Sequence, residues 1–179
     1  IVFEPDYVQH FGYPNGLSDV DIDCIYRLIQ TRAYQAGAFC SCRLFFNDSE
    51  VIFDQAVPRN TFAGFVGLFN AGEVFKTILK HPDDSNLSWE VLVAVSNKKY
   101  QQFSIVNGVY VYNGGTHMKH LKEQIVNGIQ PKAEKIFAAT KSQFNKNYIA
   151  NNLFIFMKGF VKGPEFTGQV KDKLSNPIK

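Results

Sequence analysis

Apolar residues recur at helical spacing near the start of the chain, directly after a polar segment that can begin a helix. Ser18 can accept from early helix amides and Asp21 suits the positive first turn, as in a capping box. The apolar positions that follow are Cys24, Ile25, Leu28, Ile29, Ala33 and Ala36. Because their spacing is three or four residues, the pattern predicts a helix over residues 19–36 that stops at Gly37.

The chain between residues 39 and 112 has the composition and spacing of strands. Paired apolar runs flank Asn47-Asp48 and the polar segment 81–85, which predicts two hairpins. Residues 60–70 fit a short helix between them. Val2–Tyr7 fits a short first strand or an extended entry, broken by Pro5. The other expected strands are Phe39–Phe46, Val51–Phe53, Val74–Lys80, Trp89–Val95 and Phe103–Tyr112.

A second long helix is expected after the break at Asn113-Gly-Gly115, with Thr116 as its cap. Its apolar stripe is Met118, Leu121, Ile125 and Ile129. Gly128 and Pro131 are expected to kink or interrupt it. Leu153–Val161 is typical of a buried strand, and the tail from Glu165 is polar and loop-like. Strands with two main helices predict an α+β domain with a helix layer on a sheet.

Composition narrows the class of protein. The 179 residues suit one domain, and 45% apolar with 20% charged residues excludes a disordered or fibrous chain. No apolar run approaches the roughly 20 residues of a membrane helix, and no signal segment opens the chain. The chain starts at Ile1 rather than Met, so we expect it to be part of a longer protein. Three cysteines without metal spacing favour reduced intracellular thiols.

Charge divides the chain into two parts. Residues 1–97 carry six basic and twelve acidic residues, a net −6, whereas residues 98–179 carry thirteen and four, a net +9. A basic half-chain favours a polyanionic partner, since lysines that neutralise phosphates release counterions. A merely solvated lysine surface explains the same composition.

The motifs of common catalytic sites are absent from the sequence: there is no Walker loop, HExxH or GxSxG. His117 and His120 are one helical turn apart, but without neighbouring acids or thiols they make a weak metal pair, so we expect no metal site. Asn113–His117 could bind an anion at a helix start, or form only a tight turn. A lysine in the loop Gln169-Val-Lys171 could reach a phosphate, or simply be solvated.

Read in order, these segments resemble the transducer domain of type IIA DNA topoisomerases, in the eukaryotic and large-DNA-virus branch. The resemblance covers nearly all 179 residues. It is carried by Phe3-Glu-Pro-Asp6, by Asp19–Ala38 with Arg32-Ala-Tyr34, by Gln101–Asn107 followed by Gly114-Gly-Thr-His117, by Gln124-Ile125, and by Pro164-Glu-Phe166 with Gln169-Val-Lys171. It implies a ribosomal S5 domain 2-like fold, α+β, with a mixed sheet and helices packed on one face.

The resemblance also implies how the chain is divided and what its residues do. Residues 1–10 would end an ATPase domain, 11–163 would be the transducer, and 164–179 would be the nucleotide-sensing loop and tail. Lys171 would contact the γ-phosphate of ATP in the preceding domain, and Gln169 would contact or support it. Val170 stands where the family has Thr, so a polar role there is lost. Mg²⁺ would be bound outside this chain, which would contain no catalytic residue, and Gly114–His117 would be structural.

The remaining implications concern partners. Lys132, Lys135, Lys141 and Lys146 would face the cavity that holds a DNA duplex, without sequence preference because lysines there contact phosphates. The whole protein would be an intracellular homodimer, in the nucleus, host cytoplasm or virion, with its own ATPase and cleavage-core domains. Two alternatives stay open: a transducer of a mismatch-repair or chaperone-type ATPase, and a free-standing S5-like nucleic-acid-binding module.

Overall fold

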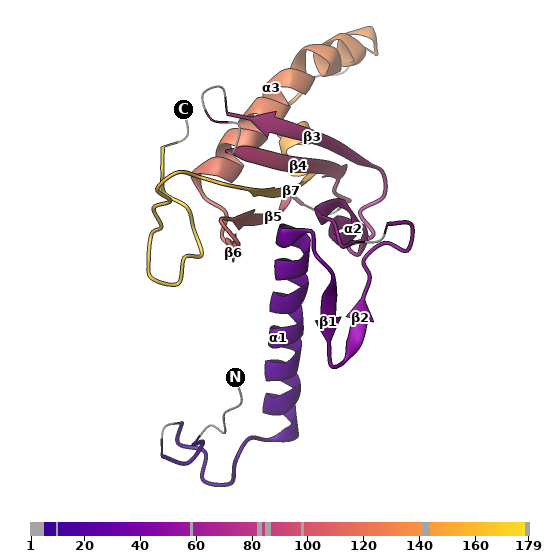
Figure 1. The fold of residues 1–179 in the computed structure, drawn as a ribbon. Coiled ribbons are helices and arrows are strands. Elements are labelled where there is room, and N and C mark those ends of the chain that lie inside the picture. Colours follow the sequence, from indigo (N-terminus) through magenta and orange to yellow (C-terminus); the bar gives the residue numbers. More distant parts are fainter. Residues whose placement is uncertain are drawn as a thin grey trace.

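A mixed five-stranded sheet lies at the centre of the fold (Figure 1). The computed structural model describes residues 6–9, 11–57, 59–81, 84, 87–97, 99–140 and 144–177, so most of the strand expected at Val2–Tyr7 lies outside it. Strands β5 and β7 pair in parallel, and all other neighbours are antiparallel. In spatial order the strands are β3 (Val74–Lys80), β4 (Ser88–Val95), β7 (Leu153–Gly159), β5 (Gln101–Val106) and β6 (Val109–Tyr110).

Both faces of this sheet are covered by helices. On β7, Ile155 and Met157 face the long helix α3 (Thr116–Ala139), whereas Phe156 faces α2 (Phe62–Gly67) and the end of α1 (Asp19–Cys40). The α+β class and the mixed sheet are therefore confirmed, but the expectation of helices on one face is wrong. Because side chains alternate along a strand, the uninterrupted apolar run of β7 needs cover on both sides.

Helix α1 begins as predicted and ends later than predicted. Ser18 Oγ accepts from the Asp21 amide at 3.2 Å, and Asp21 accepts in return from the Ser18 amide. The helix ends at Cys40, and Ser41 follows in the left-handed conformation at φ 52°. Gly37 is not the stop; it lets α1 approach Leu44, whose Cδ2 would lie 3.3 Å from an added Cβ.

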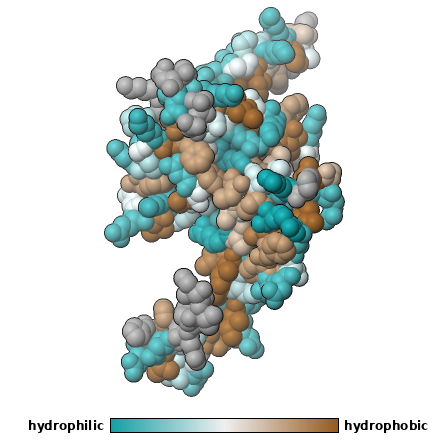
Figure 2. Space-filling view, in the orientation of Figure 1, coloured by the Kyte–Doolittle hydropathy of each residue, from teal (hydrophilic) through white to brown (hydrophobic). Residues whose placement is uncertain are grey.

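Most of α1 extends away from the sheet (Figure 1). Its buried residues, Gln35, Gly37 and Ala38, all lie near its C-terminal end. The apolar stripe is left open: Ile25 is 42% exposed, Leu28 56% and Ile29 55%. Figure 2 shows this apolar surface along α1. The described part of this chain therefore leaves the amphipathic face of α1 uncovered.

The first hairpin lies beside α1 and is shorter than expected. It consists of β1 (Leu44–Phe46) and β2 (Ser49–Val51), because Phe39 and Cys40 belong to α1. Asn47 and Asp48 both have positive φ, 49° and 59°, as two-residue hairpin turns require. The second predicted hairpin, β3 with β4, and the short helix α2 are confirmed.

The connection between the parallel strands β5 and β7 runs through β6, α3 and the short helix α4 (Asn147–Asn151). The predicted Phe103–Tyr112 stretch is divided between β5 and β6 by a turn at Asn107-Gly108, both with positive φ. Helix α3 runs without interruption through Pro131 to Ala139, so of the two expected outcomes, a kink or an interruption, the interruption is wrong. Met118 and Leu121 fix the first half of α3 in the core. In its second half, the ring of Phe137 packs against the ring of Phe144, with 5.5 Å between the centroids.

Candidate functional site

The tail after β7 forms a loop whose tip contains the three residues that the resemblance singles out. The tip is a turn in which the Lys171 amide donates to the Gly168 carbonyl at 3.1 Å. Gln169, Val170 and Lys171 are all exposed, Val170 by 75%. Within the described residues the Lys171 ammonium has no hydrogen bond or ion pair. Its backbone has φ 57°, a conformation that costs a non-glycine residue roughly 1–3 kcal/mol and often occurs at ligand contacts.

The base of this loop is bound to the start of α3. The Asn113 amide donates to the Asp172 carbonyl at 2.9 Å, and Asn113 Nδ2 donates to Asp172 Oδ2 at 2.6 Å. The Leu174 amide donates to Gly114 O at 2.9 Å, and the Thr116 amide donates to Leu174 O at 3.1 Å. Leu174 is itself fully buried. The tail is thus irregular, as predicted, but its base is an integral part of the core.

The two glycines before α3 are required by this contact. Gly114 has φ 64° and Gly115 φ 131°, and a Cβ on Gly115 would overlap the Leu174 backbone. Gly115 is the N-cap, and Thr116 is the first residue of α3 rather than its cap, which corrects the sequence prediction. The Leu174 carbonyl occupies the start of the helix, where an anion would have to lie. The arrangement favours the tight-turn interpretation of the segment.

His117 follows these glycines and is fully buried against the sheet. Ser104 Oγ donates to Val111 O at 3.1 Å, so it accepts from His117 Nε2 at 2.9 Å. The neutral ring therefore carries its proton on Nε2. Nδ1 has no partner among the described residues, so a second proton there would be buried without an acceptor. Burial lowers the pKa of His117 to about 4, and the residue acts as a structural group.

The depressed pKa of His117 predicts a specific loss of stability in acid. The unfolded chain, with a histidine pKa of about 6.5, binds the proton first as pH falls, so stability is lost between about pH 6.5 and about pH 4. We expect the free energy of unfolding to be about 2 kcal/mol lower at pH 5 than at pH 7 from this group. Urea unfolding at both pH values measures it. His117→Asn keeps a donor for Ser104 but does not titrate, and an equal acid loss in this variant would contradict the assignment.

Three of the four lysines expected at DNA lie on exposed positions around the second half of α3. Lys132 and Lys135 are one turn apart on α3, and Lys146 precedes α4. Lys141 lies outside the described residues. The fold also assembles a basic pocket of about 570 Å³ that sequence spacing did not reveal, beside the loop base. Its lining includes Lys119, Lys122, Lys173, Thr116 and Tyr100.

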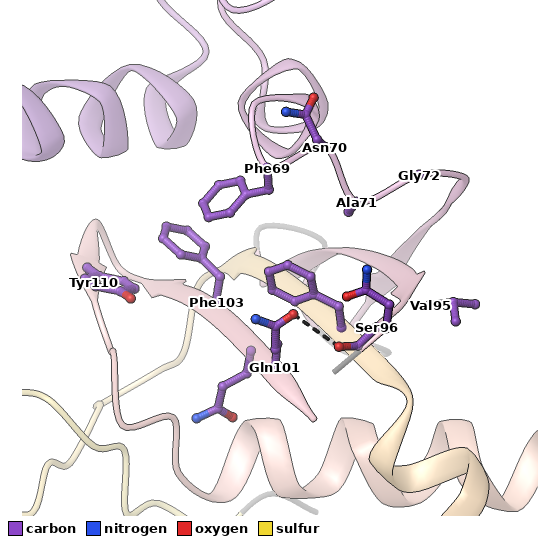
Figure 3. A pocket seen from close by; sticks show the side chains of 12 residues that line it. Phe69, Asn70, Ala71, Gly72, Val95, Ser96, Gln101, Phe103 and Tyr110 are labelled. Atoms are coloured by element: carbon purple, nitrogen blue, oxygen red, sulfur yellow. Dashed lines mark hydrogen bonds between the residues drawn. The ribbon is translucent and has the colours of Figure 1, made fainter. Parts of the chain in front are cut away.

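A second hollow lies on the opposite side of the sheet (Figure 3). It has a volume of about 760 Å³, with Phe69, Phe103 and Tyr110 on its walls and amide side chains such as Gln101 around them. Ser96 Oγ donates to Gln101 Oε1 at 3.1 Å. Burial raises the pKa of Tyr110, so its hydroxyl stays protonated near neutrality. The lining offers neutral hydrogen-bonding groups and aromatic rings, without an acid–base pair.

The described residues lack a metal cluster and a membrane-spanning helix. They contain no group of three or more His, Cys, Asp or Glu side chains arranged to hold a metal ion. Their helices include none that is both long and apolar enough to cross a membrane. The three cysteines are free and exposed.

Comparison with known proteins agrees with this geometry. The family model described as DNA gyrase B matches residues 61–178. DNA topoisomerase 2 of Saccharomyces cerevisiae is 38% identical over 195 residues, covering 100% of this chain and 12% of the relative. DNA topoisomerase 2 of Acanthamoeba polyphaga mimivirus is 28% identical over 179 residues, covering 98% of this chain and 13% of the relative. The solved ATPase and transducer domains of DNA topoisomerase II from Balamuthia mandrillaris superpose with a TM-score of 0.68 at 19% identity, covering 84% of this chain and 35% of that chain.

The sheet, its crossover helix and the returning tail loop thus define a fold shared with the ATPase-and-transducer region of type II topoisomerases. The chain belongs to the DNA gyrase B family, whose model matches well over half of it. The resemblance seen in the sequence is confirmed, including its eukaryotic and viral relatives. The chain spans only 12% to 13% of the length of the two curated relatives.

Proposed function

We propose that this chain is the transducer of an ATP-dependent type II DNA topoisomerase, which couples an ATPase domain to duplex capture and strand passage. The observation that carries the proposal is the loop at Gly168–Lys171. Its tip presents a cation that has no ion pair among the described residues, while its base is hydrogen-bonded to the start of α3. A phosphate bound at the tip would therefore act on the sheet and α3 together. ATP turnover by the Lys171→Ala variant of the intact enzyme tests the proposal.

The residues at the tip fit a nucleotide held by another domain. Lys171 offers a point charge for a terminal phosphate, and Gln169 offers an exposed amide beside it. Val170 has no hydroxyl and contributes shape alone. ATP, with Mg²⁺ bound outside this chain, would supply the phosphate and the free energy of hydrolysis. Lys171 and Gln169 would recognise that phosphate, and its loss would release the loop, in the manner of a two-state switch.

The exposed face of α1 supports a partner domain on the N-terminal side. Ile22, Ile25 and Ile29 form a continuous apolar stripe with exposures of 53%, 42% and 55%. Soluble chains cover stripes of this kind, because apolar surface contributes roughly 25 cal/mol per Å² when it is buried. We propose that the ATPase domain covers it. The division into residues 1–10, 11–163 and 164–179 belongs to the same proposal.

The lysines around the end of α3 support a DNA duplex as partner. Lys132, Lys135 and Lys146 are exposed, and the projecting half of α3 extends beyond the sheet (Figure 1). Ammonium groups without a groove-reading element bind phosphates, so recognition would be independent of sequence. Lys141 remains part of the proposal on sequence grounds. The full protein would be a homodimer, located in the nucleus or, for a viral protein, in the host cytoplasm or virion.

Charge reversal at two of these lysines provides a test. In the intact enzyme, Lys135→Glu with Lys146→Glu should weaken DNA binding and DNA-stimulated ATP turnover. The slope of log K against log salt should become shallower by about 0.9 for each lost phosphate contact. Fluorescence anisotropy at several salt concentrations measures it. Lys162→Glu, at an exposed lysine just after β7, is the matched control. Equal affinity in all three proteins would leave the lysines as a solvated surface.

A further inference from the structure

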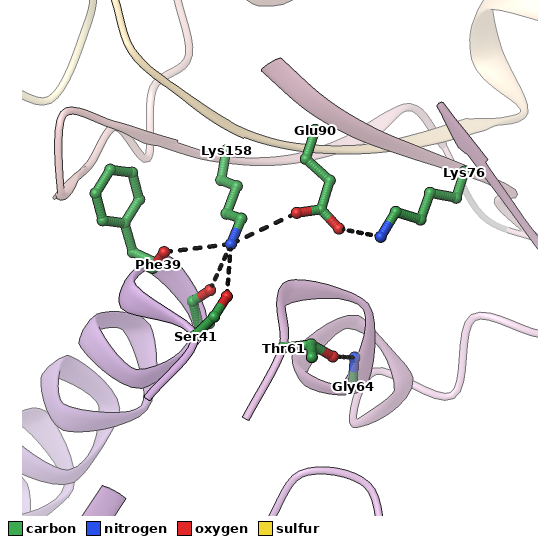
Figure 4. A network of polar contacts seen from close by, with 8 residues as sticks. Phe39, Ser41, Thr61, Gly64, Lys76, Glu90 and Lys158 are labelled. Carbon is green, nitrogen blue, oxygen red and sulfur yellow. Dashed lines mark hydrogen bonds and ion pairs between the residues drawn. The ribbon is translucent and has the colours of Figure 1, made fainter. Parts of the chain in front are cut away.

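We propose that Lys158 is the joint that fixes the direction in which α1 leaves the sheet. Lys158 lies on β7, and its side chain crosses to the last turn of α1 (Figure 4). Its Nζ donates to Ala38 O at 3.1 Å, Phe39 O at 3.2 Å and Ser41 Oγ at 3.1 Å. The side chain of Lys158 is only 15% exposed. These three bonds join segments about 120 residues apart in the chain.

The end of α1 requires such a cation. The last carbonyls of a helix lack partners within it and carry the negative end of its dipole. The Ser41 amide satisfies the Gly37 carbonyl, but α1 has no basic residue in its own last turn. Lys158 supplies both the missing donors, to Ala38 and Phe39, and the missing positive charge. Lys158, a residue of the sheet, thus caps the carbonyl end of α1, a role that a basic residue in the last turn of a helix usually has.

Glu90 and a second lysine, Lys76, hold the Lys158 ammonium in place. Glu90 pairs directly with Lys158 across β4 and β7, with 3.5 Å between Nζ and Oε2. Lys76, on the edge strand β3, binds the other oxygen of Glu90 at 2.6 Å. Glu90 is itself 17% exposed, so removal of its partners would leave a partly buried charge. The three side chains form a row of ion pairs that runs from Lys76 at the sheet edge, through Glu90, to Lys158 at the end of α1.

Because the joint lies at one end of α1, a small change of angle there moves the other end of the helix over a large distance. The buried residues of α1 all lie in its last six residues, and the 22-residue helix is about 33 Å long. A tilt of about 10° at the joint would move the far end of α1 by about 6 Å. The other contacts between α1 and the sheet are made by rings, such as Phe39 against Phe160 at 5.3 Å between ring centroids and Arg32 over Tyr110 at 5.9 Å. The β1–β2 hairpin, which is not part of this sheet, supports the middle of α1 through Asn47 Nδ2, which donates to the Tyr26 hydroxyl at 3.2 Å. Lys158 provides the directional contacts.

The joint also lies between the two features of the proposed function. The exposed apolar stripe is on α1, and β7 leads into the tail that carries Lys171. We infer that Lys158 is a positioning residue through which movement of a domain on α1 reaches the sheet. This second step rests on the proposed function, whereas the joint itself does not.

The joint is tested by a distance measurement in the intact protein. Spin labels are placed on Cys24, in the free part of α1, and on Thr77→Cys in β3, with other reactive cysteines replaced by serine. The protein without a substitution at Lys158 should give one narrow intrachain distance distribution, measured in dimers in which only one subunit is labelled. Lys158→Met, which keeps the length but removes the charge, should broaden or shift it by about 4 Å for each 10° of tilt. Lys158→Arg should restore the narrow distribution, and Lys162→Met, on an exposed lysine after β7, should not change it.

An unchanged distribution in Lys158→Met overturns the joint. If that variant does not fold, the same distances are measured in Lys158→Gln, which is polar but shorter and uncharged, and an unchanged distribution in it again overturns the joint. Coupling is measured separately, as ATP turnover with and without duplex DNA. Lys158→Met should retain basal turnover and lose most of the DNA stimulation, whereas full stimulation would overturn its coupling role. A wild-type protein without any DNA-stimulated ATP turnover would contradict the proposed function, while the distance measurement would still decide the joint.

Discussion

Replacement of Lys171 by alanine in the intact enzyme is expected to lower ATP turnover and strand passage by about 10²- to 10³-fold. This is the usual effect of removing one preorganised donor from a phosphate or oxyanion. The Lys171 ammonium is unpaired in the described chain, and the loop base holds its backbone in place, so its charge is available to a nucleotide. Steady-state phosphate release and decatenation of linked DNA circles measure the two activities.

DNA cleavage by the same variant should remain near the wild-type level, because the proposed contact concerns the nucleotide alone. Lys173→Ala is the matched control, since Lys173 is exposed and only two residues away. It should retain nearly full ATP turnover. Wild-type turnover in Lys171→Ala would contradict the nucleotide-sensing role of the loop.

Gly115→Ala should be among the most destabilising single substitutions in the described chain. The backbone of Gly115 has φ 131°, and an added Cβ would overlap the carbonyl oxygen of Leu174. Neither the Gly115 backbone nor the Leu174 backbone can move without a large loss of free energy, since Leu174 is fully buried and hydrogen-bonded to Gly114 and Thr116. We expect a loss of about 4 kcal/mol or more in the free energy of unfolding. Equilibrium unfolding in urea, followed by circular dichroism, measures it.

Gly128→Ala provides the opposite expectation from the same chemical change. Gly128 lies within α3, is exposed, and has nothing within 4 Å of an added Cβ. Alanine there should stabilise the helix by about 1 kcal/mol. A loss of stability similar to that of Gly115→Ala would show that the tail contact is not the cause of the first effect.

The elements that the sequence predicted well are those with local signals. The capping box at Ser18 and Asp21 and the turn at Asn47-Asp48 depend on residues within a few positions of each other. The errors arose where tertiary contacts decide. Gly37 continues a helix because Leu44 approaches it closely, and α3 passes through Pro131 because its first half is fixed in the core. The uninterrupted apolar run of β7 indicates burial on both faces of the sheet, which a helix layer on one face does not provide.

In the candidate site, too, some residues could be recognised from the sequence, and the contacts between them only from the structure. The segments that contain Gly115 and Lys171 stand out by their residue types, but their roles were predicted only through the resemblance. The contacts that hold the site join distant parts of the chain, such as Asn113 with Asp172 and Lys158 with Ala38. Side chains of these types are common in loops and strands, so no local pattern distinguishes the pairs. Three-dimensional proximity alone reveals them.

The burial of Leu174 has a consequence for how the loop can change during evolution. The fold holds the tail through backbone hydrogen bonds and one apolar side chain, all outside the exposed tip at Gln169–Lys171. Selection on stability therefore acts on the anchor, while selection on ligand recognition acts on the tip. Substitutions at Val170, 75% exposed, are then nearly neutral for folding. Such a separation lets the recognition residues diverge between relatives while the scaffold that presents them stays constant.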